Sequence, residues 1–461
     1  MKRLARGWLG AGLTLRLRPI RGRPLRWLAT CTLTLGALAL GALTAASAVA
    51  AELPQNAADK HLGVASCASS VCHGSISGIE ASNVLQNEFV TWTQQDKHAG
   101  AYQILFNEQS ARIARNLGIG NASEAKICLD CHADNIAPAQ RGEKFQVTDG
   151  IGCEACHGGA ERWLSSHASR DASHQANVGN GMYPTDNLQA RATLCLSCHL
   201  GDNNKFATHR IMGAGHPRLA FELDTFGALQ PQHYRVDEDY LRRKGSAGSV
   251  GTWLAGLVTA SKRTLDLVQG PRFTAGGVVP EIALFDCHAC HHPMDEQRWR
   301  PRSATARLGP GQLRLNDSNL VLLAAATEVL APGRHRALLQ GMNDLHAAVL
   351  NDRSSVVRAA AKLESAVDQA GATLAAADVG GANMGRILGN LFREAQAGEY
   401  RDYVAAEQAT MAVDLLLIQM GRKDAHKGAV DRLYASVANE NRFDAAGFST
   451  NMAALQRATG L

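Results

Sequence analysis

The feature that most constrains this chain is a short motif in which two cysteines, separated by two residues, are followed at once by histidine. Two thiols at this spacing can each add to one vinyl group of a haem, and the adjacent imidazole can bind the iron. One such motif can occur by chance, whereas several in one chain predict a protein filled with haem. The motif occurs four times, as Cys128-Leu-Asp-Cys131-His132, Cys153-Glu-Ala-Cys156-His157, Cys195-Leu-Ser-Cys198-His199 and Cys287-His-Ala-Cys290-His291.

A fifth pair of cysteines has a longer spacing. In Cys67-Ala-Ser-Ser-Val-Cys72-His73, four residues separate the two thiols. The longer loop can bulge outward while it still presents both sulfurs, and the histidine that follows is kept. The alternative, a small disulfide loop, leaves His73 without a role. We therefore predict five covalently attached haem c groups, with His73, His132, His157, His199 and His291 as the first axial ligands.

Zinc is the other metal that paired cysteines commonly bind. A zinc site does not require a histidine after every cysteine pair. Ten thiolates and five imidazoles also do not divide into sets of four ligands. Zinc is therefore disfavoured for these motifs.

The second axial ligand separates an electron carrier, in which every iron has two protein ligands, from a catalyst with an open iron. Seventeen histidines are present, and the best candidates lie in the motif-bearing region away from the motifs: His98, His167, His209 and His216. The fifth ligand is left open among His61, His174, His233 and His292. For each candidate the alternative is a surface or core histidine. Met182, Met212 and Met294 could also bind iron, but nothing in the sequence selects a thioether.

The first 51 residues are expected to direct export. Basic side chains are followed by an apolar stretch from Trp27 to about Ala51, and the small residues Ala48-Val49-Ala50-Ala51 fit a cleavage site. An uncleaved anchor is the alternative, because the apolar stretch is long enough to span a bilayer. In either case the rest of the chain is predicted to be periplasmic or otherwise exported, either free or anchored to the inner membrane.

The charge balance argues against an anionic partner. The formal net charge is +5, from 47 Lys and Arg against 42 Asp and Glu, but eight basic residues and no acidic ones precede Glu52. Without that segment 39 basic residues face 42 acidic ones, and haem propionates add further negative charge. No nucleic-acid partner is therefore expected. The expected partner is a redox protein or a quinol-linked membrane complex.

The sequence predicts an all-α protein with two folded parts after the export segment. Residues 52–297 contain the motifs and many loops, so that haems replace side chains as the core. Residues 311–461 are Ala-rich, and one apolar stripe recurs at helical spacing through Val356, Ala360, Leu363, Val367, Ala370 and Leu374. This tail predicts a helical bundle that packs on the haem domain or forms a homo-oligomer. Its histidines, His335, His346 and His426, are expected to be packing residues.

Individual helices are also predicted from apolar spacing and from start signals. Their ranges are 88–117, broken at Gly100, then 253–268, 384–392, 403–418 and 429–437.

The stretch from Cys67 to about Pro217 resembles the cytochrome c-554 family of multihaem cytochromes. The resemblance is carried by Thr91-Trp92 with His98-Ala99-Gly100-Ala101 after the first motif, and by Gly150-Ile-Gly-Cys153-Glu-Ala-Cys156-His157-Gly158. The motif ending at His199 continues it. The resemblance implies a mainly helical protein with closely stacked haem pairs and mostly bis-histidine ligation, and it favours His98 as a second axial ligand. The expanded first motif departs from the family pattern, and the fifth motif and the helical tail lie outside the resemblance.

Two functions follow as expectations. The resemblance implies an electron carrier in respiratory, nitrogen or sulfur metabolism. The wider superfamily includes hydroxylamine oxidoreductase and pentahaem nitrite reductase, in which one haem stays open. The alternative is therefore an oxidoreductase that acts on a small nitrogen or sulfur species such as hydroxylamine, nitrite or tetrathionate. The lysine-containing motif C-x-x-C-K of that nitrite reductase does not occur here.

Overall fold

The computed structural model describes residues 51–82, 84–169, 171–246, 248–275, 279–291 and 301–461. In this part of the chain the fold is all-α, as predicted, with helices and 3-10 turns but no β-strand; isolated bridges join His61 to Arg141 and Phe285 to Leu315. Of the described helices, none is both long enough and apolar enough to cross a membrane. The predicted export segment and the candidates His292 and Met294 lie outside the described residues.

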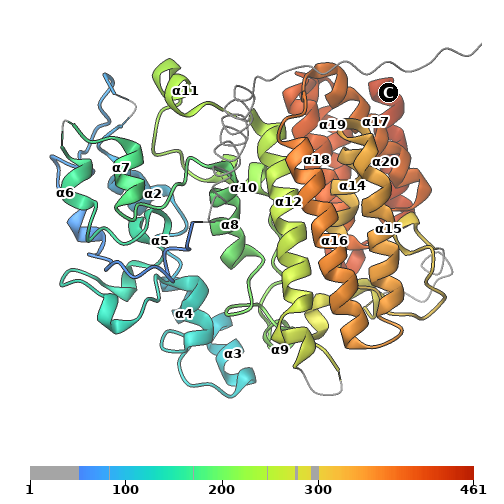
Figure 1. Ribbon diagram of the computed structural model, residues 1–461, viewed down its shortest axis with the longest axis horizontal. Coiled ribbons are helices and arrows are strands. Elements are labelled where there is room, and N and C mark those ends of the chain that lie inside the picture. The colour runs from blue at the N-terminus through green and yellow to red at the C-terminus, as the bar shows by residue number, and fades with distance from the viewer. Residues whose placement is uncertain (1–50, 83, 170, 247, 276–278, 292–300) are drawn as a thin grey trace, which may run out of the picture. The chain divides into compact units, whose positions relative to one another are not determined.

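Short helices separated by loops make up the part of the chain that carries the first four motifs (Figure 1). They are α2 (Glu88–Gln95), α3 (Glu108–Leu117), α4 (Lys126–His132), α5 (Cys153–His157), α6 (Leu164–His167), α7 (His174–Gly179), α8 (Leu188–His199), α9 (His209–Gly213), α10 (Leu223–Leu229) and α11 (Glu238–Lys244). The 3-10 turns of this part are η1 (Val64–Ser66), η2 (Gln103–Phe106), η3 (Pro138–Gln140) and η4 (Val147–Asp149).

Longer helices form a bundle from residue 248 onwards (Figure 1). They are α12 (Gly248–Gln269), α14 (Ser318–Leu330), α15 (Pro332–Ala348), α16 (Arg353–Leu374), α17 (Gly381–Ala397), α18 (Tyr403–Gln419), α19 (Lys423–Ser436) and α20 (Ala445–Thr459). The one-turn helix α13 (Pro271–Thr274) and the 3-10 turns η5 (Ile282–Leu284), η6 (Cys287–Ala289), η8 (Ser303–Thr305) and η9 (Glu440–Arg442) connect them.

The bundle has the only large apolar core found among the described residues, and it runs from Val250 in α12 to Leu455 in α20. Helix α16 begins where the Asp352 side chain accepts a hydrogen bond from the Ser355 amide, and its predicted stripe is buried. Helix α14 packs against α12, α15, α17 and α18, so that apolar side chains are buried on all of its faces. Helix α12 lies before the predicted boundary between the two parts, yet it packs against α14 and α16. The domain boundaries themselves stay a prediction.

The motif-bearing part, in contrast, has little apolar core of its own. In the described chain, two small clusters lie outside the bundle. One consists of Tyr102, Leu105, Ala114, Ala122 and Ala133, and the other of Ile113, Leu117, Ile211 and Ala214. Side-chain packing of this extent stabilises only a small domain. A large apolar group would supply the missing core.

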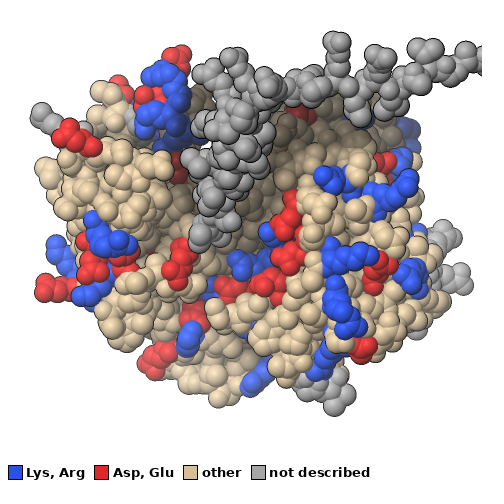
Figure 2. Space-filling model, in the orientation of Figure 1, with Lys and Arg blue, Asp and Glu red and all other residues tan. Residues whose placement is uncertain are grey.

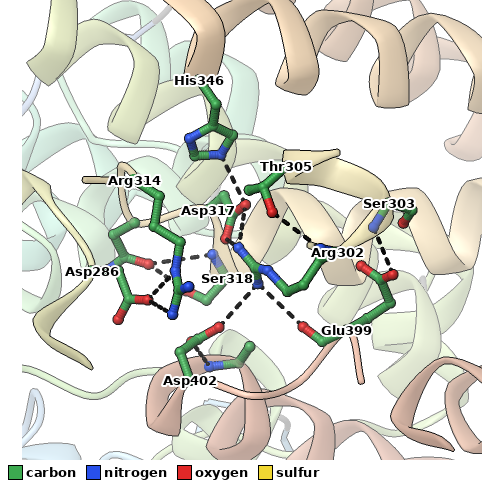
Figure 3. A network of polar contacts seen from close by, with 12 residues as sticks. Asp286, Arg302, Ser303, Thr305, Arg314, Asp317, Ser318, His346, Glu399 and Asp402 are labelled. Atoms are coloured by element: carbon green, nitrogen blue, oxygen red, sulfur yellow. Dashed lines mark hydrogen bonds and ion pairs between the residues drawn. The ribbon is translucent and has the colours of Figure 1, made fainter. Parts of the chain in front are cut away.

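A buried ion-pair network joins the last motif to the bundle (Figure 3). The guanidinium of Arg302, whose side chain is 2% exposed, donates to both carboxylate oxygens of Asp317 at 2.8 Å and to Asp402 at 3.0 Å. The imidazole of His346 reaches Asp317 from the other side, at 3.0 Å. Beside this network Asp286 pairs with Arg314. Since Asp286 immediately precedes Cys287, this pair fixes the start of the last motif to the segment that leads into α14.

Candidate cofactor centre

We number the five candidate sites 1 to 5 by the order of their cysteine motifs along the chain. Three of the motifs lie on α-helix: α4 ends at His132, α5 runs from Cys153 to His157, and α8 ends at His199. Two cysteines three positions apart on a helix share one face, so both sulfurs can reach the same group. In site 5 the cysteines are carried by the 3-10 turn η6 instead of an α-helix. Asp286 caps this turn by accepting a hydrogen bond from the His288 amide at 2.9 Å.

The first motif replaces the helical turn with a closed loop. The amide of His73 donates to the carbonyl of Cys67 at 3.2 Å, and the amide of Cys72 donates to the carbonyl of Ser69 at 2.8 Å. Val71, inside this loop, is 79% exposed. The additional residues therefore bulge outward, and the two cysteines stay at the ends of the loop beside His73.

Each of the five motif histidines faces a second histidine from elsewhere in the chain. A metal ion bound by two imidazole nitrogens at about 2 Å each, on one axis, holds the two ring centroids about 6 Å apart. The observed pairs are His73 and His167 at 6.2 Å, His98 and His199 at 6.1 Å, His132 and His216 at 6.3 Å, His157 and His233 at 6.3 Å, and His209 and His291 at 6.3 Å. Every pair thus leaves room for one iron between its rings.

The four histidines expected as second ligands, His98, His167, His209 and His216, all belong to these pairs. The position left open in the sequence is taken by His233, in the loop after α10. Two of the other candidates for this position, His61 and His174, bond to carboxylates instead.

His61 is fully buried, and its Nδ1 donates to Asp134 at 2.6 Å, while His174 Nε2 donates to Asp186 at 2.8 Å. Within the described residues, no group of three or more His, Cys, Asp or Glu is placed to hold a metal ion.

In five of the ten paired histidines, Nδ1 donates a hydrogen bond to another group of the protein. It donates to a carboxylate in His73, to Glu88 at 2.9 Å, and in His98, to Asp96 at 2.9 Å. In the other three it donates to a backbone carbonyl: His132 to Ala101, His167 to Leu164, and His216 to Pro217, at 3.1, 2.5 and 2.7 Å. Nε2 is thereby turned toward the partner ring, which is how a metal-binding imidazole is usually oriented.

Burial and hydrogen bonding shift the pKa values of these groups. Burial lowers the pKa of both His157 and His199 to about 4, with the facing histidine adding to the effect, so the neutral form that can bind iron prevails. The hydrogen bond to Glu88 raises the pKa of His73, against burial. Burial acts to raise the pKa of Asp96, but hydrogen bonds from His98 and Gln230 prevail and hold it at about 2.

Sulfur contacts bring four of the sites together in two pairs. The Cys153 thiol donates to the Cys67 sulfur, which lowers the pKa of Cys67 and links sites 1 and 3. Similarly, the Cys131 thiol donates to the Cys198 sulfur, linking sites 2 and 4. The Lys205 ammonium also donates to Cys198, at 3.0 Å. These hydrogen bonds bring the pKa of Cys198 down to about 5, although burial opposes them.

Two further relationships connect these pairs into one series. Cys156 of site 3 is close enough to Cys195 and Cys198 of site 4 for their charges to raise the pKa of its thiol, which burial raises most, to about 12. His209 of site 5 begins helix α9, and His216 of site 2 follows the same helix after a short turn. Through these relationships the candidate sites can be followed in the order 1, 3, 4, 2, 5.

The apolar surface near several motifs is uncovered. Ile127 next to Cys128 is 50% exposed, and Ile104 and Phe106 are 50% and 61% exposed. Val71 and Ile76, at and just after the first motif, are more exposed still. A flat apolar group held at the cysteines would cover such side chains, so the residues present fit haem.

A comparison with protein families gives one match. Residues 66–158, which include the first three motifs, match the model of the family described as cytochrome c554 and c-prime. The searches of curated proteins and of solved structures gave no match. The matched segment contains α2 to α5 and the carboxylates Glu88 and Asp96.

Proposed function

We propose that this chain, whose residues 66–158 match the model of the cytochrome c554 family, is an exported electron carrier with five haems, each bound by two histidines. The family match supports a c-type cytochrome with covalently bound haem. The number of haems, their ligands and their order are our proposal. The five facing histidine pairs carry it.

Under this proposal the ten motif cysteines hold the haems, and the pairs 73/167, 132/216, 157/233, 98/199 and 209/291 supply the axial ligands. A bound haem supplies an iron that takes up and releases one electron. The protein fixes five of these ten imidazoles by hydrogen bonds from Nδ1. Because five of five motif histidines have a facing partner, a carrier is favoured over an oxidoreductase with an open iron.

The order of the sites supports a single path through the protein. Sites 1 and 3, 3 and 4, and 4 and 2 approach one another through their cysteines, and site 5 follows site 2 through α9. At the two ends, Cys72 of site 1 and His291 of site 5 are exposed. Electrons would enter at one of these ends and leave at the other.

The charges on the surface bear on the kind of partner. We propose that the partner is a redox protein or a quinol-linked membrane complex. Acidic and basic side chains are interspersed over the face seen in Figure 2. This mixture fits short-lived docking better than binding to a polyanion such as nucleic acid.

The direct test combines two measurements on the purified protein. The mass of the intact chain should exceed that of the polypeptide by five haems. The optical spectrum of the reduced protein should not change when carbon monoxide is added, because every iron already has two protein ligands. Fewer than five haems would remove a site, first of all the expanded site 1. A bleached and shifted Soret band would mean an accessible iron and would favour the oxidoreductase.

A further inference from the structure

Two of the ten paired histidines donate to a carboxylate on the side away from their partner ring, namely His73 to Glu88 and His98 to Asp96. Both carboxylates belong to the ends of helix α2. Glu88 is its first residue and Asp96 is its C-cap. The side chain of Trp92 between them donates to the Ile151 carbonyl at 3.0 Å, which fixes α2 against the segment before Cys153.

Both carboxylates are held in place by other hydrogen bonds. Glu88 Oε1 accepts from the amides of Leu85 and Gln86 at 2.8 and 3.1 Å, which leaves Oε2 for His73. The side chain of Glu88 is 15% exposed and that of Asp96 is 8% exposed.

Asp96 Oδ1 accepts from both the amide and the Nδ1 of His98, at 3.0 and 2.9 Å. Its Oδ2 accepts from Gln230 at 3.0 Å. Each carboxylate therefore keeps one oxygen on the imidazole and is fixed by its other bonds.

Site 2 offers a comparison within the same chain. There both histidines, His132 and His216, donate to neutral backbone carbonyls, of Ala101 and Pro217. A carboxylate takes a larger share of the imidazole proton than a carbonyl does, which makes the ring a stronger donor to the metal. A stronger donor favours the ferric over the ferrous state and so lowers the reduction potential.

We propose that Glu88 and Asp96 are positioning residues that lower the reduction potentials of sites 1 and 4 by strengthening His73 and His98 as iron ligands. This inference rests on the proposed function, because it requires irons between the facing histidines. It assigns a redox role to one eight-residue helix that bears none of the cysteines.

The test is a redox titration of the full-length holoprotein, followed optically, for the wild type and for Glu88→Gln and Asp96→Asn. Each substitution should shift one of the five reduction steps to higher potential and leave the other four in place. Glu88→Gln keeps Oε1 for the two loop amides. If Asp96→Asn fails to mature, Asp96→Ser removes the carboxylate while keeping an oxygen for the His98 amide.

Asp130→Asn is the matched control for loss of charge alone. Asp130 is a partly buried carboxylate inside the second motif, and it bonds to Lys126 and Asn135. Its loss should change the electrostatic potential near site 2 without changing how an imidazole donates to iron. The electron paramagnetic resonance signal of one low-spin ferric haem should therefore shift in Glu88→Gln, and that of another in Asp96→Asn. The signals of Asp130→Asn should stay at their wild-type positions.

Two kinds of failure can be told apart. Fewer than five haems, or carbon monoxide binding by the wild type, would contradict the proposed function. Five haems with no carbon monoxide binding, but with unmoved reduction steps or unchanged resonance signals in both α2 variants, would overturn only the role of Glu88 and Asp96.

Discussion

His233 faces His157 with their ring centroids 6.3 Å apart and their planes nearly perpendicular, at 89°. His157 ends the short helix α5, whereas His233 comes from the loop between α10 and α11. We predict that His233→Ala leaves the iron of site 3 with one protein ligand. The reduced variant should bind carbon monoxide at one haem in five, as measured from the Soret band.

His174→Ala is the control for this substitution, because His174 is a partly exposed histidine of the same region that bonds to Asp186 instead of facing a motif histidine. Its spectrum should not respond to carbon monoxide. A response in His174→Ala alone would reassign the ligand.

The expanded first motif is tested by removing both of its thiols. Cys67→Ala combined with Cys72→Ala should lower the mass of the mature protein by one haem, since no covalent attachment then remains in site 1. Intact-protein mass spectrometry gives the count. An unchanged mass would show that Cys67 and Cys72 hold no haem.

The buried network around Arg302 predicts a large loss of stability. Arg302→Met leaves Asp317 and Asp402 as buried carboxylates without their cation, which should lower the free energy of unfolding by roughly 3–5 kcal/mol. Chemical denaturation followed by far-ultraviolet circular dichroism measures it. Arg307→Met, which removes the pair with Asp344 at a 59% exposed side chain, should cost about 1 kcal/mol or less. Equal losses in the two variants would contradict this account.

A half-buried carboxyl in the bundle, that of Glu394, predicts a pH dependence. Burial raises the pKa of Glu394 to about 8, and the neighbouring Glu399 and Glu328 add to this, while the hydrogen bond from Tyr400 opposes it. Between the unfolded value near 4.5 and about 8 the folded state binds the extra proton, so stability falls as pH rises through this window.

The slope should be at most about 1.4 kcal/mol per pH unit. Glu394→Gln should abolish this part of the dependence, as denaturation curves at about pH 5 and pH 8.5 would reveal. Parallel curves for the wild type and the variant would contradict the assignment.

Helices with a clear apolar stripe could be predicted from the sequence. The stripe from Val356 to Leu374 lies in α16, and the ranges expected at 403–418 and 384–392 lie in α18 and α17. Helix α14 has no such stripe, because its Leu, Val and Ala side chains are buried on every side, and periodicity does not detect it. The helix expected at 88–117 is interrupted over a longer stretch than one glycine explains, because Asp96 ends α2 and caps the turn before His98.

The candidate site was predictable where the residues are adjacent in sequence. The motifs name the cysteines and the first histidines, and the enrichment of histidine in one region identified four of the facing partners. His233 could not be separated from His61 and His174, since nothing local distinguishes a loop histidine that faces His157 from one that faces Asp134 or Asp186. Glu88 was missed for the same reason, whereas the short spacing of Asp96 and His98 was a signal that could have been used.

The facing pairs also have a consequence for the chain as a polymer. Each pair joins segments that lie several tens of residues apart, such as His73 with His167 or His209 with His291. Under the proposed ligation each iron closes a long loop, as a disulfide does in a small secreted domain, and removes conformational entropy from the unfolded chain. Since little apolar core holds this part together, its cohesion would depend on the coordination bonds, and loss of the iron–histidine bonds would loosen it while the bundle stayed folded.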